Sequence, residues 1–156
     1  MKKFELTSEF VTNIFGTKLF RIKALVEFGD VEAGELGGYI EKEENLDHDG
    51  DAWVYGNAQV YGNARVYGDA WVSGDADYAY AHGFGSINRT TTFFRLKDGG
   101  VGVLCGCFYG TLQEFRDKVQ ETHGESETAE LYLDLATLME KRFGRAGNEQ
   151  KTEEES

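Results

Sequence analysis

Three histidines and two cysteines are the side chains of this 156-residue chain best suited to acid–base or nucleophilic chemistry. His82, in the segment AYAHGFG, carries an imidazole that titrates near neutral pH and can act as a general base. Cys105, Cys107 and His123 would give a thiol–imidazole site if the fold brought them within hydrogen-bond reach. No nucleophile or cofactor loop lies beside His82 in the sequence, and two cysteines with one histidine fall short of the four ligands of structural zinc. We therefore predict a non-enzymatic protein with no catalytic residue, metal ion or cofactor.

One arginine surrounded by hydroxyl side chains forms the best candidate for a small-ligand site. Such a group can bind a phosphate, especially beside a helix N-terminus, so a nucleotide is the ligand we expect if a small molecule binds. The alternative is a loop whose hydroxyls satisfy its own backbone. The residues of this site are Ser86, Arg89, Thr90, Thr91 and Thr92.

Acidic residues dominate one part of the chain. The net charge is −12, and residues 27–51 hold ten carboxylates against one base, Lys42. This charge disfavours direct binding to nucleic acid or to an acidic membrane and favours a partner with a basic surface, although solubility alone is the simpler interpretation. Aromatic residues follow closely, and interfaces are enriched in tryptophan and tyrosine. The predicted protein-binding surface comprises Glu41, Glu43, Glu44, Trp53, Tyr55, Tyr61, Tyr67 and Trp71.

A six-residue repeat must position these side chains. Valines recur every six residues from position 54 to 72, and alanines every six residues from 52 to 76, which is the period of the hexapeptide repeat. We expect a β-helix in which valine and alanine point inward and Gly-Asn or Gly-Asp pairs form the corners. Extending the register places Leu36, Ile40, Leu46, Tyr78 and Phe84 inward as well. Three hexads make one coil, so residues eighteen apart should be neighbours: Trp53 beside Trp71, and Asp47 beside Arg65. The tryptophans would then lie either on an exposed flank or under the flanking segments.

The segments that flank the repeat differ in kind. Residues 1–35 alternate as strands and should form an N-terminal β cap. Residues 86–143 should form a C-terminal α+β cap, a β-hairpin followed by two helices. The first helix begins at the capping box of Thr111 and Glu114 and stops at Gly124, and the second ends near Phe143. Residues 144–156 read as a flexible, solvated tail.

The repeat GDAWVYGNAQVYGNARVYGDAWVSGDA resembles the left-handed β-helix hexapeptide-repeat family over residues 36–85. That family includes many acyltransferases and some zinc hydrolyases, usually trimers, so the resemblance implies a left-handed coil and a trimer. Its catalytic histidines have no counterpart here, because His48 and His82 do not share a coil register and His123 lies in the helical part. The wider layout, with LGGYIEKEENL, TTTFFRLKDGG and CGCFYGTLQEF, resembles uncharacterised small bacteriophage and prophage proteins with a C-terminal α+β segment. That resemblance implies a genetic context in which small proteins inhibit host defence.

These observations lead to one expectation of fold and three of function. The fold is mainly β: a short left-handed β-helix of about three coils, capped by the N-terminal strands and by the C-terminal hairpin and helices. The first function is a non-enzymatic phage or prophage protein that binds a basic host defence protein through the acidic and aromatic surface. The alternatives are a nucleotide-sequestering protein and an acyltransferase-like enzyme. We expect a homo-oligomer, with a trimer favoured. We also expect a location in the bacterial cytoplasm, because the chain has no signal-like or membrane-spanning segment.

Overall fold

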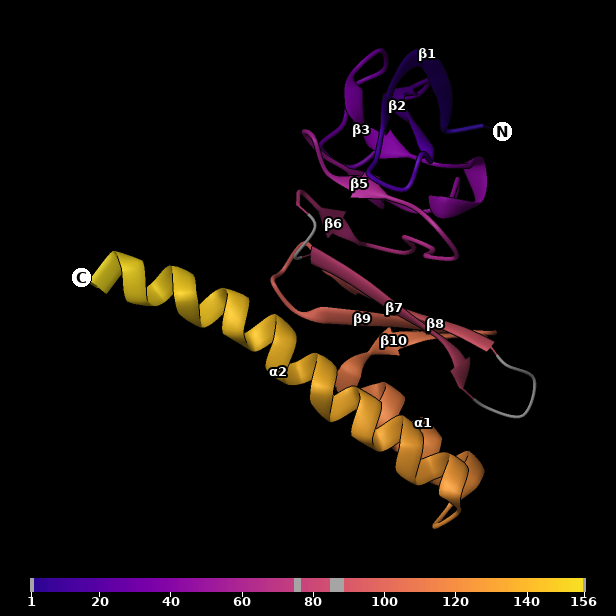
Figure 1. Ribbon diagram of the computed structural model, residues 1–156, viewed down its shortest axis with the longest axis vertical. Helices are drawn as coiled ribbons and strands as arrows, with labels where there is room; N and C mark the ends of the chain where they lie inside the picture. Colours follow the sequence, from indigo (N-terminus) through magenta and orange to yellow (C-terminus); the bar gives the residue numbers. More distant parts are fainter. Residues whose placement is uncertain (1, 75–76, 85–88, 156) are drawn as a thin grey trace.

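The computed structural model describes residues 2–74, 77–84 and 89–155, and arranges them in successive layers (Figure 1). The N-terminal strands are β1 (Phe4–Thr12), β2 (Lys18–Ala24) and β3 (Leu36–Ile40), followed by the short 3-10 helix η1 (Glu43–Asn45). The repeat contributes β4 (Trp53–Val54), β5 (Gln59–Val60) and β6 (Trp71–Val72). The remainder consists of β7 (Tyr78–Phe84), β8 (Arg89–Arg95), β9 (Val101–Cys105), β10 (Phe108–Thr111), α1 (Leu112–His123) and α2 (Glu127–Glu155).

The expected β-helix is wrong, because the strands of the described residues belong to separate sheets. One sheet has the order β1-β2-β3-β5, a second has the order β10-β9-β8-β7, and β4 pairs only with β6. The first sheet is mixed, since β3 pairs antiparallel with β2 and parallel with β5. No closed or solenoid β-helix joins these strands within the described ranges.

An irregular step in the repeat accounts for part of this difference. Ile40 lies opposite Val60, and Leu46 bridges to Val66, so these partners are twenty residues apart. Val54 lies opposite Val72, which is eighteen residues away. The register therefore changes between Leu46 and Val54, where eight residues replace the usual six. The resulting ladders are only two residues long.

The inward positions of the repeat are nevertheless predicted well. Its four valines are fully buried, its alanines at 52, 58, 64 and 70 are at most 3% exposed, and Ile40 and Leu46 join the same core. Glycines 56, 62 and 68 turn the chain with positive φ, as expected of corner residues. Trp53 lies directly opposite Trp71. Leu36 is the exception, because 54% of its surface is exposed.

Two adjacent glycines allow β3 to cross closely over the repeat. A Cβ atom on Gly37 would lie 2.6 Å from the Val54 carbonyl oxygen and 2.7 Å from the Trp53 ring. A Cβ atom on Gly38 would lie 2.6 Å from the Ala58 carbonyl oxygen. No larger residue fits either position without moving the backbone beneath it. The two glycines of β3 are thus required by this close approach.

The second sheet lies between the repeat and the helices. β7 pairs antiparallel with β8, so the strand that sequence analysis assigned to the end of the repeat belongs to this sheet. Thr111 and Glu114 form the predicted capping box of α1, and Gly124 ends that helix. α2 continues past Phe143 to Glu155, where a flexible tail was expected, and projects away from the rest of the molecule (Figure 1). No helix in the described part of the chain combines the length and apolar composition that crossing a bilayer requires.

Tyrosines of the second sheet cover turns of the repeat. The Tyr109 hydroxyl lies against Gly68 and accepts a hydrogen bond from the Asp69 amide at 3.2 Å, while the Tyr80 hydroxyl lies against Gly62. Tyr78, Phe94 and Leu104 of the second sheet also belong to the same buried cluster as the repeat valines. The repeat and the second sheet therefore share one core.

Candidate protein-binding surfaces

A groove with acidic walls lies where η1 meets the repeat. Its volume is about 510 Å³, and we call it the acidic groove; it is lined by Glu43, Glu44, Leu46, Asp47, His48, Arg65, Val66 and Tyr67. The parallel bridge between Leu46 and Val66 brings its two walls together. Buried Asn45 holds η1 in place, because its side-chain amide donates to the carbonyl oxygens of Gly62 (3.1 Å) and Ala64 (2.9 Å).

The carboxylates of the acidic groove differ in whether they form ion pairs. Glu43 pairs with Lys2 (3.2 Å) and with His48 (2.9 Å), and the hydrogen bond from Lys2 followed by that from His48 lowers the pKa of this carboxyl group. Among the described residues, no ion pair engages Glu44, Asp47 or the guanidinium of Arg65. Asp47 and Arg65 face the same groove, as their eighteen-residue spacing predicts, but they do not pair. Two carboxylates therefore remain available to a cationic ligand.

His48 is held rigidly at the wall of the acidic groove. Its Nδ1 accepts a hydrogen bond from the Lys3 amide (3.0 Å), so Nε2 carries the proton that faces Glu43. Its ring also stacks on Phe4 with 4.2 Å between centroids. Lys3 itself is 3% exposed and donates from Nζ to the Ala52 carbonyl oxygen at 2.7 Å. Desolvation lowers the pKa of Lys3 from 10.5 to about 8, although Asp47, Asp51 and Asp49 oppose the shift.

The two tryptophans have different environments. Trp53 is 0% exposed and packs edge-on against Phe4 and Phe28, and its Nε1 has no hydrogen-bond partner among the described residues. Its assignment to a binding surface is therefore wrong. Trp71 is partly exposed and stacks on Tyr55 with 4.4 Å between ring centroids. Only Trp71 can therefore contact a partner directly.

The Trp71–Tyr55 stack lies beside three carboxylates. A small depression next to it is lined by Asp30, Asp51, Asp69 and Lys97, among others, and Lys97 pairs with Asp30 at 2.8 Å. Burial, followed by the charges of Asp30, Glu35 and Asp51, raises the pKa of the Tyr55 hydroxyl. No group of three or more metal-ligating side chains in the described ranges is arranged to hold a metal ion, and this cluster is no exception.

The remaining residues of the predicted surface lie apart from one another. Tyr67 borders the acidic groove and packs edge-on against Tyr109 at 5.0 Å. Glu41 accepts a hydrogen bond from the Gly62 amide at 2.8 Å, and Tyr61 is partly buried. The acidic and aromatic residues thus divide between the acidic groove and the Trp71–Tyr55 stack.

Two threonines of the predicted phosphate site, Thr91 and Thr92, are buried in the structure. Thr91 and Thr92 are 0% and 1% exposed, because β8 is covered on both faces. The Thr91 hydroxyl donates to Cys105 Sγ at 3.3 Å, and the Thr92 hydroxyl accepts from the Arg65 amide at 3.1 Å, so neither faces a ligand. Arg89 is described as part of β8, and Ser86 lies outside the described residues. The Thr90 hydroxyl contacts His82 Nδ1 at 2.6 Å.

The residues of the predicted thiol–imidazole site lie around one cavity. A cavity of about 250 Å³ between β9, β10 and the helices is lined by Cys105, Cys107, His123 and Tyr132, among others. The buried Cys105 Sγ donates weakly to the Tyr132 hydroxyl at 3.8 Å, whereas Cys107 and His123 are exposed. The cysteines and the histidine share this cavity without a hydrogen bond between thiol and imidazole among the described contacts.

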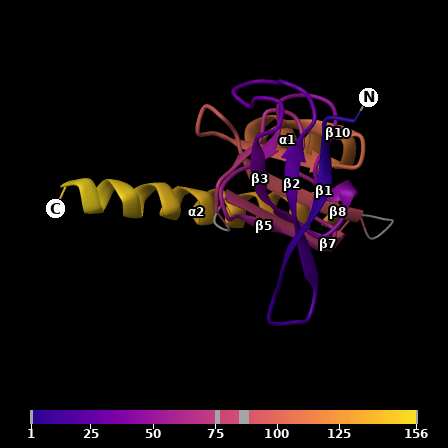
Figure 2. The ribbon, with the colours of Figure 1, turned by 90° about the horizontal axis from the view of Figure 1, so that it is seen from above.

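Sequence analysis missed one surface feature, the end of the β1–β2 hairpin. We define the hairpin end as Phe10, Ile14, Phe15 and Lys18. Ile14 is 92% exposed and Phe15 is 79% exposed, and both lie in the turn between the strands. The hairpin extends well past the body of the molecule (Figure 2). The available signal was the pair of large apolar residues directly before Gly16, because glycine is typical of turns and turns usually carry polar residues.

Comparisons with known proteins assign no family to the chain. No protein-family model matches it, and no curated protein matches it.

Proposed function

We propose that the chain is a non-enzymatic binding protein whose acidic groove receives a cationic, partly apolar segment of a protein partner. The observation that carries the proposal is a pair of carboxylates, Glu44 and Asp47, that make no ion pair among the described residues and lie beside the half-buried ring of Tyr67. A lysine or arginine of the partner would pair with the carboxylates while its apolar neighbours cover the ring. The groove volume of about 510 Å³ lies within the range typical of ligand-binding clefts.

Charge distribution supports a basic partner. Three carboxylates line the groove against one guanidinium, and the whole chain carries a net charge of −12. Such a field speeds the encounter with a basic surface and repels nucleic acid. The likeness to small phage and prophage proteins makes a host defence protein in the bacterial cytoplasm the partner class that we propose.

The test is affinity capture from a bacterial lysate with matched variants. Glu44→Lys combined with Asp47→Lys reverses the groove charge, and Glu125→Lys, on the exposed turn between the helices, serves as the control. The proposal expects a specific protein that binds the wild type and the control and is lost with the groove variant. That protein, once purified, should bind the wild type directly in calorimetry. Equal capture by all three proteins, or no captured protein, would refute the proposal.

A further inference from the structure

The chain carries chemistry complementary to its own acidic groove. We propose, building on the function proposed for the groove, that the hairpin end of one copy docks in the acidic groove of a second copy. The contact would run head to tail, because the two surfaces involve different elements. The hairpin end supplies apolar side chains and one cation, and the groove supplies an aromatic wall and carboxylates.

The hairpin end is rigid enough to act as a preformed ligand. The Asn13 side-chain oxygen accepts hydrogen bonds from the amides of Phe15 and Thr17, both at 3.0 Å. The Gly16 amide donates to the Asn13 carbonyl oxygen, also at 3.0 Å. These bonds fix the turn that presents Ile14 and Phe15, so little conformational entropy is lost when it binds.

The base of the hairpin is also fixed. The Arg21 guanidinium pairs with Glu9 and donates to the Gly37 carbonyl oxygen at 2.6 Å. It also stacks over the Tyr39 ring at 4.3 Å, so the hairpin is attached to β3 on the side that faces the repeat. The projecting end leaves the apolar side chains of Ile14 and Phe15 largely exposed to water. Covering its apolar side chains would therefore stabilise both copies.

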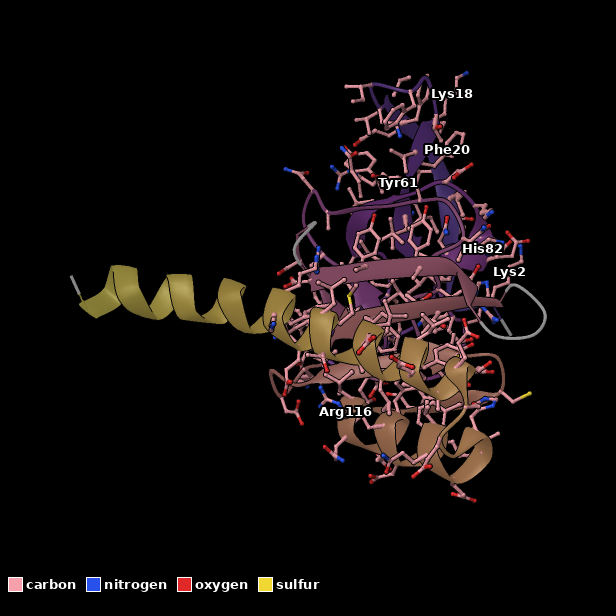
Figure 3. All side chains as sticks on the ribbon, turned by 60° about the horizontal axis from the view of Figure 1, so that its bottom comes forward. Lys2, Lys18, Phe20, Tyr61, His82 and Arg116 are labelled. Carbon is pink, nitrogen blue, oxygen red and sulfur yellow. The ribbon has the colours of Figure 1, made fainter. Side chains whose placement is uncertain are left out.

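The charges of the two surfaces match. Lys18 lies at the far end of the hairpin near Phe20, remote from Arg116 on α1 (Figure 3). Its Nζ lies 4.8 Å from the Phe10 ring centroid, and no carboxylate within the described ranges pairs with it. Glu44 and Asp47 are likewise unpaired, so docking would satisfy a cation and two anions without breaking an existing ion pair.

A head-to-tail contact also constrains the assembly. Each copy has one hairpin end and one groove, so successive contacts generate either a closed ring or an open filament. Closure after three copies would give a trimer, the oligomer that the resemblance to the hexapeptide-repeat family implies. In either form the hairpin end occupies the groove, so it would compete with another protein partner for Glu44 and Asp47.

Sedimentation velocity tests the contact through a charge exchange. The wild type should show an assembly larger than a monomer within roughly 1 to 200 µM protein, the concentrations at which a weak specific contact is populated. Lys18→Glu and Glu44→Lys should each raise the dissociation constant of the head-to-tail contact roughly tenfold, and the double variant should return the constant to the wild-type value. Phe15→Ser should raise it by about thirtyfold, whereas Leu138→Ser, on the exposed face of α2, should leave it unchanged.

Two outcomes would overturn the inference. One is a wild type that remains monomeric over the whole concentration range, and the other is a double charge variant no better assembled than either single variant. The Phe15→Ser protein keeps the groove intact, so lysate capture with it tests the proposed function separately. If this variant captures a partner while the wild type never self-associates, only the head-to-tail contact fails.

Discussion

The contrast between Trp53 and Trp71 gives a direct test of where the repeat places its aromatic side chains. Trp53 is 0% exposed, so truncation to alanine should reduce the free energy of unfolding by about 3–5 kcal/mol, the usual cost of deleting a buried large aromatic side chain. Trp71 is partly exposed and stacks on Tyr55, so Trp71→Ala should cost only about 1 kcal/mol.

The Nε1 of Trp53, which is buried without a hydrogen-bond partner among the described residues, predicts a different effect for phenylalanine than for alanine at this position. A buried donor without a partner costs roughly 1–3 kcal/mol, and phenylalanine removes that donor while it keeps most of the ring. Trp53→Phe should therefore lose much less stability than Trp53→Ala, about 1–2 kcal/mol. Urea unfolding followed by far-UV circular dichroism measures all three variants on one scale.

Fluorescence provides an independent check, because the chain contains only two tryptophans. In Trp71→Phe the emission comes from Trp53 alone and should be blue-shifted and protected from iodide quenching. In Trp53→Phe it comes from Trp71 and should be more accessible. If Trp53 were quenched as readily as Trp71, or if Trp71→Ala cost more than Trp53→Ala, the assignment of one ring to the core and the other to the surface would be refuted.

Three further predictions concern backbone crowding, a buried amine and thiol access. Gly38→Ala should destabilise the protein by about 1–3 kcal/mol, because its Cβ would clash with the Ala58 carbonyl oxygen. Gly144→Ala, in α2 with no described atom within 4 Å of its Cβ, should stabilise the protein by about 0.5–1 kcal/mol, so the two variants should shift the thermal unfolding temperature in opposite directions. Between pH 8 and 10.5 the unfolded chain keeps a proton on Lys3 that the folded chain releases. The free energy of unfolding of the wild type, measured relative to that of Lys3→Met, should therefore rise over this range by at most about 3 kcal/mol. A difference between the two proteins that does not change with pH would argue against a buried amine. Cys107 should react rapidly with a thiol reagent in the folded protein and Cys105 only after unfolding, which mass spectrometry of labelled peptides can resolve.

The repeat shows how far sequence patterns reach in this molecule. Valine and alanine spacing predicts the buried positions because burial depends on local alternation. It does not predict the sheets, because strand partners depend on the eight-residue step from Leu46 to Val54 and on the departure of β7 to another sheet. Local periodicity contains no information about which distant strand each edge meets.

The candidate site was predictable only in part. The excess of carboxylates indicates an acidic surface, but Glu44 and Asp47 face one groove only because Asn45 fixes η1 against the repeat. Thr91 and Thr92 resemble an exposed polar cluster in the sequence, yet β8 lies between two packed layers and both hydroxyls point inward. Burial of consecutive residues on both faces of a strand is decided by tertiary packing rather than by residue type.

The tyrosines that cover the turn glycines determine how the molecule loses its structure. Tyr109 lies on Gly68, and core side chains of the second sheet pack among the repeat valines, so neither part has a complete interior without the other. Heat or denaturant should therefore melt the repeat and the second sheet in one transition rather than in sequence. For the same reason, a fragment cut between β6 and β7 would expose the interiors of both halves, and each half would be a substrate for proteases rather than a separate domain.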